Sequence, residues 1–147
     1  MGRELTRRAT AADAERLGAL HHAFQIEFSA PTPGPELLAE RIEAAIERDE
    51  LVFIVAPDGF AQLSFRRTLI FGVVALLEEL YVAPFARGQG QGRALLEDAM
   101  DAARERGATS MELNTSEADT AARALYASAG FTNLEDGSPM LFYERDL

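Results

Sequence analysis

The stretch that decides the fold runs from Glu78 to Arg93 and reads EELYVAPFARGQGQGR. Its first residues end an apolar segment, Val73 to Val82, whose composition predicts a buried strand. A proline turn comes next, and three glycines follow on alternate positions, namely Gly88, Gly90 and Gly92. Apolar residues then recur at helical spacing from Gln91 to Arg106, with Gly107 as the expected C-cap. The stretch therefore predicts a strand, a glycine-rich turn and a helix in direct succession.

The glycine-rich turn has the features of an anion site. Glycine lets the backbone bend sharply and approach a ligand, and successive N–H groups then point into one concavity. The helix behind the turn adds its unpaired first-turn donors and the positive end of its dipole. Gly92 is followed by Arg93 rather than by the lysine of a Walker A loop, and the spacing Gly-x-Gly-x-Gly differs from the dinucleotide fingerprint. Arg87 and Arg93 on either side favour a phosphate ligand over a turn without one.

The remaining pattern predicts a single mixed α/β domain over residues 1–147. Thr10 with Asp13, and Ser116 with Asp119, have the spacing of capping boxes at helix starts. In chain order we expect a strand at Leu5 to Ala9, helices from Thr10 and from Pro35, strands at Leu51 to Ala56, Phe60 to Arg67 and Val73 to Val82, the helix from Gln91, a strand at Thr109 to Asn114, a helix capped by Ser116, and final strands at Phe131 and Met140 to Arg145.

Composition argues against several classes of function. The formal net charge of -10 disfavours nucleic-acid binding, because an acidic surface repels phosphates. Attraction of cationic molecules and solubility alone are the two interpretations of this charge. The sequence has no cysteine, which excludes disulfides, thiolate zinc sites and a cysteine nucleophile. No stretch approaches the roughly 18 apolar residues of a membrane span, and the first residues lack the apolar core of a signal peptide. We therefore expect a cytoplasmic protein without nucleic-acid or membrane partners.

Further motifs share their order and spacing with one enzyme family. Val82-Ala83-Pro84 closes the apolar strand, and Arg87, Gly90 and Gly92 match the pattern Arg/Gln-x-x-Gly-x-Gly/Ala. The later pattern Asn-x-x-Ala-x-x-Leu-Tyr-x-x-x-Gly-Phe is matched at Ala122, Leu125, Tyr126, Gly130 and Phe131. Residues 73 to 133 thus resemble the GNAT superfamily of N-acetyltransferases, and Arg8 to Asp13 resembles the family's opening strand and helix. The resemblance implies a mixed central sheet of six to seven strands flanked by about four helices.

The resemblance also implies that the cofactor is acetyl-CoA. The backbone amides of Gln89 to Arg93 would hold the pyrophosphate, and the backbone of Leu80 to Val82 would run beside the pantetheine arm, where the sheet splays around the acetyl group. The family's common Asn is Asp119 here, and Asn114 is expected to supply part of the missing contact. The residues expected to bind the cofactor are Leu80, Tyr81, Val82, Arg87, Gly88, Gln89, Gly90, Gln91, Gly92, Arg93 and Asn114.

Acetyl transfer to an amine requires a neutral nitrogen, so a base that removes a proton assists the reaction. Glu78 and Glu79 interrupt the apolar strand, where a buried charge is costly without compensation. Adjacent strand residues point to opposite faces, so one of the two is expected to face the reaction site, and a bulge would exchange the faces. Glu78 stands nine residues before Arg87, which by resemblance to diamine acetyltransferases is the position of the proposed base. Two ordinary carboxylates, one solvated and one paired, are the alternative.

Tyr126 is the expected general acid for the leaving CoA thiolate, by its place in the family motif and because a phenol stays protonated near neutral pH. A core aromatic is the other interpretation. Without cysteine an acetyl-cysteine intermediate is excluded, so direct attack in a ternary complex is expected, with a backbone N–H near Val82 as oxyanion donor. The sequence shows no spacing of metal ligands, and His21-His22 is interpreted as a solvent or core-edge pair.

The sequence does not decide the identity of the acceptor. The first two helices would build its site, with Phe24, Phe28 and the loop Ala30 to Pro35 as candidate lining. The acidic balance favours a small cationic amine such as a polyamine, an aminoglycoside or a lysine-like amine. A protein or peptide amine is the alternative acceptor, and a non-catalytic acyl-CoA sensor is the alternative function. A homodimer is compatible with the fold.

Overall fold

The computed structural model describes residues 5–147, and these residues form seven strands and four α-helices. In chain order the elements are β1 (Arg7–Arg8), α1 (Ala14–Glu27), α2 (Pro35–Glu47), β2 (Val52–Ala56), β3 (Gly59–Thr68), β4 (Gly72–Val82), α3 (Gln91–Glu105), β5 (Ala108–Leu113), α4 (Thr120–Ser128), β6 (Leu134–Glu135) and β7 (Ser138–Pro139). Short 3₁₀ turns, η2 (Ala11–Asp13) and η3 (Pro84–Ala86), precede α1 and follow β4. The chain divides into two compact units, Met1–Leu113 and Asn114–Leu147, and each is described on its own.

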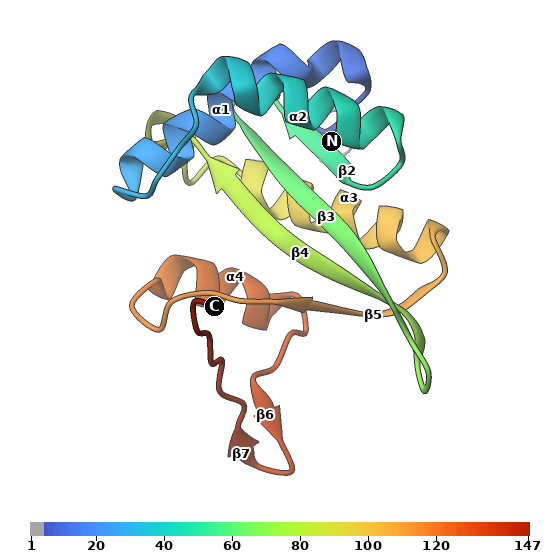
Figure 1. Cartoon of the computed structure of the whole chain (residues 1–147). Coiled ribbons are helices and arrows are strands. Elements are labelled where there is room, and N and C mark those ends of the chain that lie inside the picture. The colour runs from blue at the N-terminus through green and yellow to red at the C-terminus, as the bar shows by residue number, and fades with distance from the viewer. Residues whose placement is uncertain (1–4) are drawn as a thin grey trace. The chain divides into compact units, whose positions relative to one another are not determined.

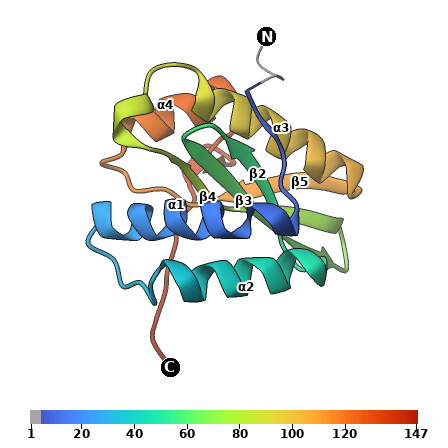
Figure 2. The same cartoon turned by 90° about the horizontal axis from the view of Figure 1, so that it is seen from above.

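The first unit contains a mixed sheet in the strand order β1-β2-β3-β4-β5, of which Figure 1 labels β2 to β5. Neighbouring strands are antiparallel except β4 and β5, which run parallel and are joined through α3. Helix α3 covers one face of this sheet, and α1 and α2 lie together over the other (Figure 2). The predicted mixed α/β class is confirmed, but the central sheet of the described chain has five strands rather than six to seven, because β6 and β7 pair with each other.

The core on the α1–α2 face connects both helices with the three middle strands. One buried cluster contains Leu17, Ile42, Phe53, Phe60 and Tyr81. Full burial of an apolar side chain of this size contributes roughly 1.5–3 kcal/mol. The two helices approach closely at Gly18, where an added Cβ would lie 2.6 Å from the carbonyl oxygen of Pro35. This packing fixes α1 against the end of β4.

Glycines and caps set the ends of the helices as the sequence indicates. Helix α3 starts after Gly90 and ends before Gly107, whose φ angles of 87° and 79° are left-handed and favour glycine. Ahead of α1, the N–H of Thr10 donates to Oδ2 of Asp13 at 2.8 Å, which confirms the expected role of Asp13. A hydrogen bond from Arg7 to Asp13 holds the pKa of this carboxyl down, at about 2.

Strand β4 contains a β-bulge at its two carboxylates. Gln62 of β3 pairs with Glu79, whereas the following residue, Leu63, pairs with Leu77. Glu78 is therefore the extra residue of β4, and the alternation of side chains along the strand shifts by one at this point.

In the second unit, α4 starts three residues later than a cap at Ser116 would require. Asp119 is the N-cap, and its Oδ1 accepts a hydrogen bond from the N–H of Ala122 at 3.0 Å. The hydroxyl of Ser116 accepts instead from the N–H of Ala118 in the preceding turn. The predicted capping box is therefore wrong, because the Asp119 carboxylate takes the capping position itself.

The predicted final strands are also wrong in their positions. Asp136 and Gly137 have φ angles of 50° and 80° and connect the two-residue strands β6 and β7. Phe131 closes α4, because its N–H donates to the carbonyl of Tyr126 at 3.0 Å. Residues 140–147 form no strand in the described chain, because a strand needs a hydrogen-bonded neighbour and this segment has none beyond the contact at Met140.

None of the helices in residues 5–147 has the length and apolar character that crossing a membrane requires.

Candidate active site

The glycine-rich turn follows β4 and η3 and leads into the first turn of α3. Gly88 and Gly90 have φ angles of 78° and 87°, a conformation that glycine adopts without strain. Apart from the glycine itself and its two chain neighbours, no described residue has an atom within 4 Å of a Cβ built on Gly88 or Gly90, so backbone conformation rather than crowding requires them. Gly90 is the N-cap of α3 and has no side chain with which to cap the amides at the second and third helical positions. We refer to residues 88–93 as the cradle, and its backbone suits a phosphate group.

The start of α3 is anchored to the turn between β2 and β3. The buried side chain of Gln91 accepts from the N–H of Asp58 at 3.0 Å and donates to its Oδ2 at 3.2 Å. The carbonyl of Asp58 accepts in turn from the N–H of Ala83, at 2.8 Å. Asp58 thereby connects the end of β4 with the cradle. The sequence marks Asp58-Gly59 as a turn but gives no sign of this contact, which spans 33 residues.

The side chain of Arg87 points to α1. Its Nη2 donates to both carboxylate oxygens of Glu27, at 3.0 and 2.8 Å, and its Nε donates to the carbonyl of Val82 at 2.9 Å. Glu27 is the last residue of α1 and is not among the site residues predicted from the sequence. No local pattern marks it, because its partner lies 60 residues away.

The backbone of β4 is open along part of one edge. Pairing with β5 ends at Leu77, opposite Leu113, whereas pairing with β3 continues to Val82. Within the first unit, the segment from Glu78 to Val82 therefore pairs with a strand on its β3 side alone, and the carbonyl of Val82 also accepts from Nε of Arg87. This segment contains Leu80 to Val82, which the resemblance assigns to the pantetheine arm, and it begins where the pairing of β4 with β5 ends.

Glu79 lies on the face of the sheet that α1 and α2 cover. Across β3 and β4, Phe60 pairs with Tyr81 and Gln62 pairs with Glu79. Residues two apart share a face, so Glu79 shares the face of Tyr81, which belongs to the buried cluster with α1 and α2. Its exposure is intermediate. The bulge shifts the alternation between Leu77 and Glu79, so these two residues face opposite sides of the sheet although they are two positions apart.

The two carboxylates have different surroundings. Glu78 is exposed, and its Oε1 accepts a hydrogen bond from the hydroxyl of Ser64. Burial raises the pKa of Glu79 to about 7, and the negative charge of Glu78 adds to the rise. A carboxyl group with this pKa exchanges protons near neutral pH, as a general base must.

The aromatic side chains beside Glu79 belong to the α1–α2 face. Tyr81 lies 5.0 Å from Phe24 between ring centroids, and Phe24 lies 5.2 Å from Phe28. His21 stacks on Phe60 with 5.2 Å between centroids, and burial lowers its pKa. Its neighbour His22 contacts Thr32 Oγ1 through Nδ1 at 3.0 Å. Phe24 and Phe28, the expected acceptor lining, therefore form an aromatic row that extends from Tyr81 along α1.

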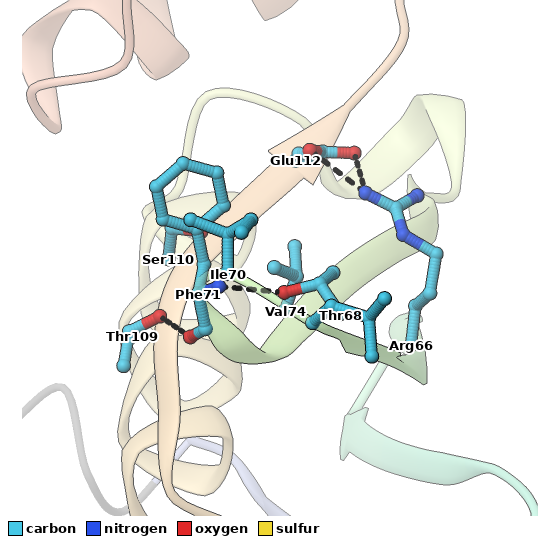
Figure 3. A pocket seen from close by; sticks show the side chains of 9 residues that line it. Arg66, Thr68, Ile70, Phe71, Val74, Thr109, Ser110 and Glu112 are labelled. Carbon is cyan, nitrogen blue, oxygen red and sulfur yellow. Dashed lines mark hydrogen bonds and ion pairs between the residues drawn. The ribbon is translucent and has the colours of Figure 1, made fainter.

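A separate hollow of about 600 Å³ lies at the opposite end of β4, by its turn with β3 (Figure 3). Its lining includes Leu69, Ile70 and Phe71, which are all exposed. At its rim, Arg66 donates to both oxygens of Glu112, at 3.1 and 3.2 Å. No sequence motif points to this hollow, and none of the predicted site residues lines it.

The other predicted site residues belong to the second unit and are described within it. Asn114 follows β5 directly, and Tyr126 lies on α4 with its ring edge-on to Phe131 at 6.0 Å between centroids. Asp119 is occupied as the N-cap of α4. Across residues 5–147, no group of three or more His, Asp or Glu side chains has the arrangement of a metal site.

Comparison with known proteins identifies the family of the chain. Residues 17–131 match the model of the acetyltransferase (GNAT) family. An aminoglycoside N(6')-acetyltransferase type 1 of Klebsiella aerogenes is 40% identical over 105 residues, which are 66% of this chain and 69% of that protein. A proposed acetyltransferase from Arthrobacter sp. FB24, known from its crystal structure, is 43% identical with a TM-score of 0.89, and the match covers 97% of this chain and 95% of that one.

A structure from Clostridium acetobutylicum, solved with acetyl-CoA, shares the fold at 19% identity and a TM-score of 0.75, with 96% of this chain and 94% of that one covered. The family match spans most of the two units and includes the cradle, the carboxylate pair and Tyr126. The chain belongs to the GNAT family of acetyltransferases, enzymes whose acetyl donor is acetyl-CoA.

Proposed function

We propose that this enzyme transfers the acetyl group of acetyl-CoA to a primary amine of a small cationic acceptor, by direct attack of the amine in a ternary complex. The observation that carries the proposal is the half-buried carboxyl of Glu79, which titrates near neutral pH beside the open edge of β4. A residue that only stabilises the fold gains nothing from such a position, because burying a carboxylate beside another one is unfavourable. We also propose that both units serve one transferase domain, residues 1–147.

The cradle is the proposed site of the CoA pyrophosphate. The residues at 88–93 offer backbone donors at the positive end of α3, and the left-handed Gly88 and Gly90 keep side chains away from the approach. The open edge of β4 at Leu80 to Val82 provides backbone groups for the amide-containing pantetheine arm, and a backbone N–H near Val82 is the proposed oxyanion donor. Asn114 is a further proposed contact. When bound, acetyl-CoA supplies the activated acyl group.

Glu79 is the proposed acceptor of the proton that the ammonium of the acceptor must lose before its nitrogen can attack. Its pKa of about 7 leaves a substantial ionised fraction at neutral pH and still lets it hold a proton. The sequence favoured Glu78 for this step. The structure supports a division of roles, in which the exposed Glu78, oriented by Ser64, attracts the cationic acceptor and Glu79 takes the proton. Tyr126 remains the proposed donor of a proton to the leaving thiolate.

The acceptor is proposed to be a small molecule with several amines. Glu78 and Glu79 present negative charge on or beside the α1–α2 face, and the chain as a whole carries a net charge of -10. Charges of one sign raise the local concentration of oppositely charged substrates. The Klebsiella aerogenes relative is named for acetylation of an aminoglycoside amine. Aminoglycosides and polyamines are therefore the first acceptors to examine.

The test is incubation with acetyl-CoA and a panel of amines, reading free CoA thiol together with product mass. The panel includes aminoglycosides, polyamines, lysine peptides and neutral amines. We expect thiol release coupled to a gain of one acetyl group on a polycationic small molecule. Turnover confined to neutral amines or to peptides would contradict the proposed acceptor. CoA binding without transfer to any member of the panel would count against the amine transferase itself.

A further inference from the structure

The guanidinium of Arg87 connects the segment before the cradle with the end of α1. It donates to both oxygens of Glu27 at 3.0 and 2.8 Å and to the carbonyl of Val82 at 2.9 Å. Hydrogen bonds between ionised groups are stronger than neutral ones, and a guanidinium that reaches both carboxylate oxygens also fixes direction. Arg87 therefore has one defined orientation in this structure, although its side chain is half exposed.

A buried tyrosine supports the same pair. The hydroxyl of Tyr81 donates to Oε1 of Glu27 at 3.1 Å, and the guanidinium carbon of Arg87 lies 5.8 Å from the centre of the Tyr81 ring. Tyr81 is only 4% exposed and belongs to the buried cluster. An exposed ion pair alone contributes little, but this one rests on a ring that the core holds in place. Glu27, Arg87 and Tyr81 together are called the latch below.

The latch holds one end of the cradle. Arg87 immediately precedes Gly88, and the other end is held by Gln91 through Asp58. Between these anchors lie the two left-handed glycines, which have more freedom in an unrestrained chain than any other residue. Fixing both ends reduces the ordering that must accompany ligand binding, which raises affinity without adding a contact to the ligand.

We propose that Glu27 is a positioning residue for acetyl-CoA, because it holds Arg87 so that the cradle presents its backbone amides in the binding conformation. The inference rests on the proposed assignment of the cradle to the CoA pyrophosphate. Under this proposal Arg87 orders the cradle and does not contact the phosphates directly. It also connects α1, which carries the proposed acceptor lining, to the affinity for the cosubstrate, and such coupling is reciprocal.

The two roles for Arg87 predict opposite results for Glu27→Gln. If Glu27 positions the cradle, its replacement weakens CoA binding. If Arg87 contacts the pyrophosphate directly, the same replacement releases Arg87 from a competing carboxylate, and CoA binds as well as before or more tightly.

The experiment is calorimetric titration of CoA into the wild type, Glu27→Gln, Arg87→Gln and the double variant. We expect each single variant to raise the Kd about 5- to 20-fold and the double variant to be no more than about twice as weak as the weaker single variant, since both act through one contact. With acetyl-CoA and a working amine, the KM for acetyl-CoA should rise about as much, while kcat stays within about twofold of the wild type. A merely structural role would not produce this split.

Glu112→Gln is the matched control, because it removes an ion pair of the same geometry with Arg66 at the opposite end of β4 (Figure 3). Its Kd for CoA should equal that of the wild type, and thermal unfolding verifies that all variants are folded. An unchanged or tighter Kd in Glu27→Gln, or an equal loss in Glu112→Gln, would overturn the proposal. Wild-type protein that binds CoA but acetylates no amine would contradict the proposed function, and the titration would still decide the role of Glu27.

Discussion

The cradle and the carboxylate pair lie at the same end of β4 but work by different physical means. Residues 88–92 are three glycines and two glutamines, so this part of the cradle contributes backbone donors and a helix dipole, none of which titrates. Glu78 and Glu79 contribute side-chain carboxylates, and the pKa of Glu79 depends on burial and on its neighbour. Cofactor binding and proton transfer are therefore expected to respond separately to mutation and to pH.

The largest effect should come from Glu79→Gln, which removes the proposed proton acceptor and keeps its shape. We expect turnover to fall about 10²- to 10³-fold, which lies within the usual range for loss of general base catalysis. The Kd for CoA should stay within about twofold of the wild type, because the cradle is formed by backbone. Steady-state thiol release and CoA titration on one preparation measure both. Equal losses in binding and turnover would show that the two regions are not separable.

Gly90→Val should weaken CoA binding, the property that Glu79→Gln leaves nearly unchanged. A β-branched residue at a φ of 87° is strained by about 1–3 kcal/mol, so the turn is expected to leave its conformation and CoA to bind about 10-fold more weakly or worse. Gly90→Asn should lose less, because Asn tolerates left-handed backbone.

Gly107→Val is the matched control for this strain. Gly107 has a φ of 79° at the other end of α3, with the same open space around a built Cβ. Gly107→Val should lower the melting temperature about as much as Gly90→Val does and leave the Kd for CoA unchanged. A comparable loss of CoA affinity in Gly107→Val would attribute the effect to α3 as a whole.

A smaller effect is expected from Glu78→Gln, which removes the like charge beside Glu79. The pKa of Glu79 should fall, so the rise of kcat with pH should move to lower pH. Turnover at neutral pH should change by less than about 10-fold, because the proton acceptor remains. Glu97→Gln, on the exposed side of α3, tests for a general effect of charge and should leave the profile in place. An unmoved profile in Glu78→Gln would contradict the electrostatic coupling of the pair.

The smallest effect concerns stability. The folded-state pKa of Glu79 is raised from 4.5 to about 7, so the folded protein binds this proton more tightly than the unfolded chain does. Stability linked to Glu79 is thus fully present below about pH 4.5 and is lost as the pH rises to about 7. Glu79→Gln should melt at a higher temperature than the wild type at pH 8, with a smaller difference at pH 5. A constant difference across this range would argue against the raised pKa.

The cradle could be predicted from the sequence because its determinants are local. A strand, a proline turn, alternate glycines and a helix lie within Glu78 to Arg93, and the structure begins α3 at Gln91, where the spacing predicts. Left-handed glycines bracket the helix at Gly90 and Gly107, so its ends depend on neighbouring residues alone.

The environment of Glu79 and the latch could not be predicted in this way. The bulge depends on the register between β3 and β4. This register shifts between Gln62 and Leu63, and no residue pattern in either strand indicates the shift. The pairing of Glu27 with Arg87 joins residues 60 positions apart. The strand predicted at Met140 to Arg145 is wrong for a related reason. A strand requires a neighbouring strand, and an apolar composition does not specify one.

The pH dependence of kcat for acetyl transfer, compared between the wild type and Glu79→Gln with saturating acetyl-CoA and acceptor, tests the role of Glu79 most directly. A base acts in its ionised form, so the wild type should gain activity through about pH 7 and then reach a plateau. Glu79→Gln should be slow and lack this inflection. An identical inflection in both proteins would show that another group takes the proton, and would contradict the assignment of Glu79 as the base.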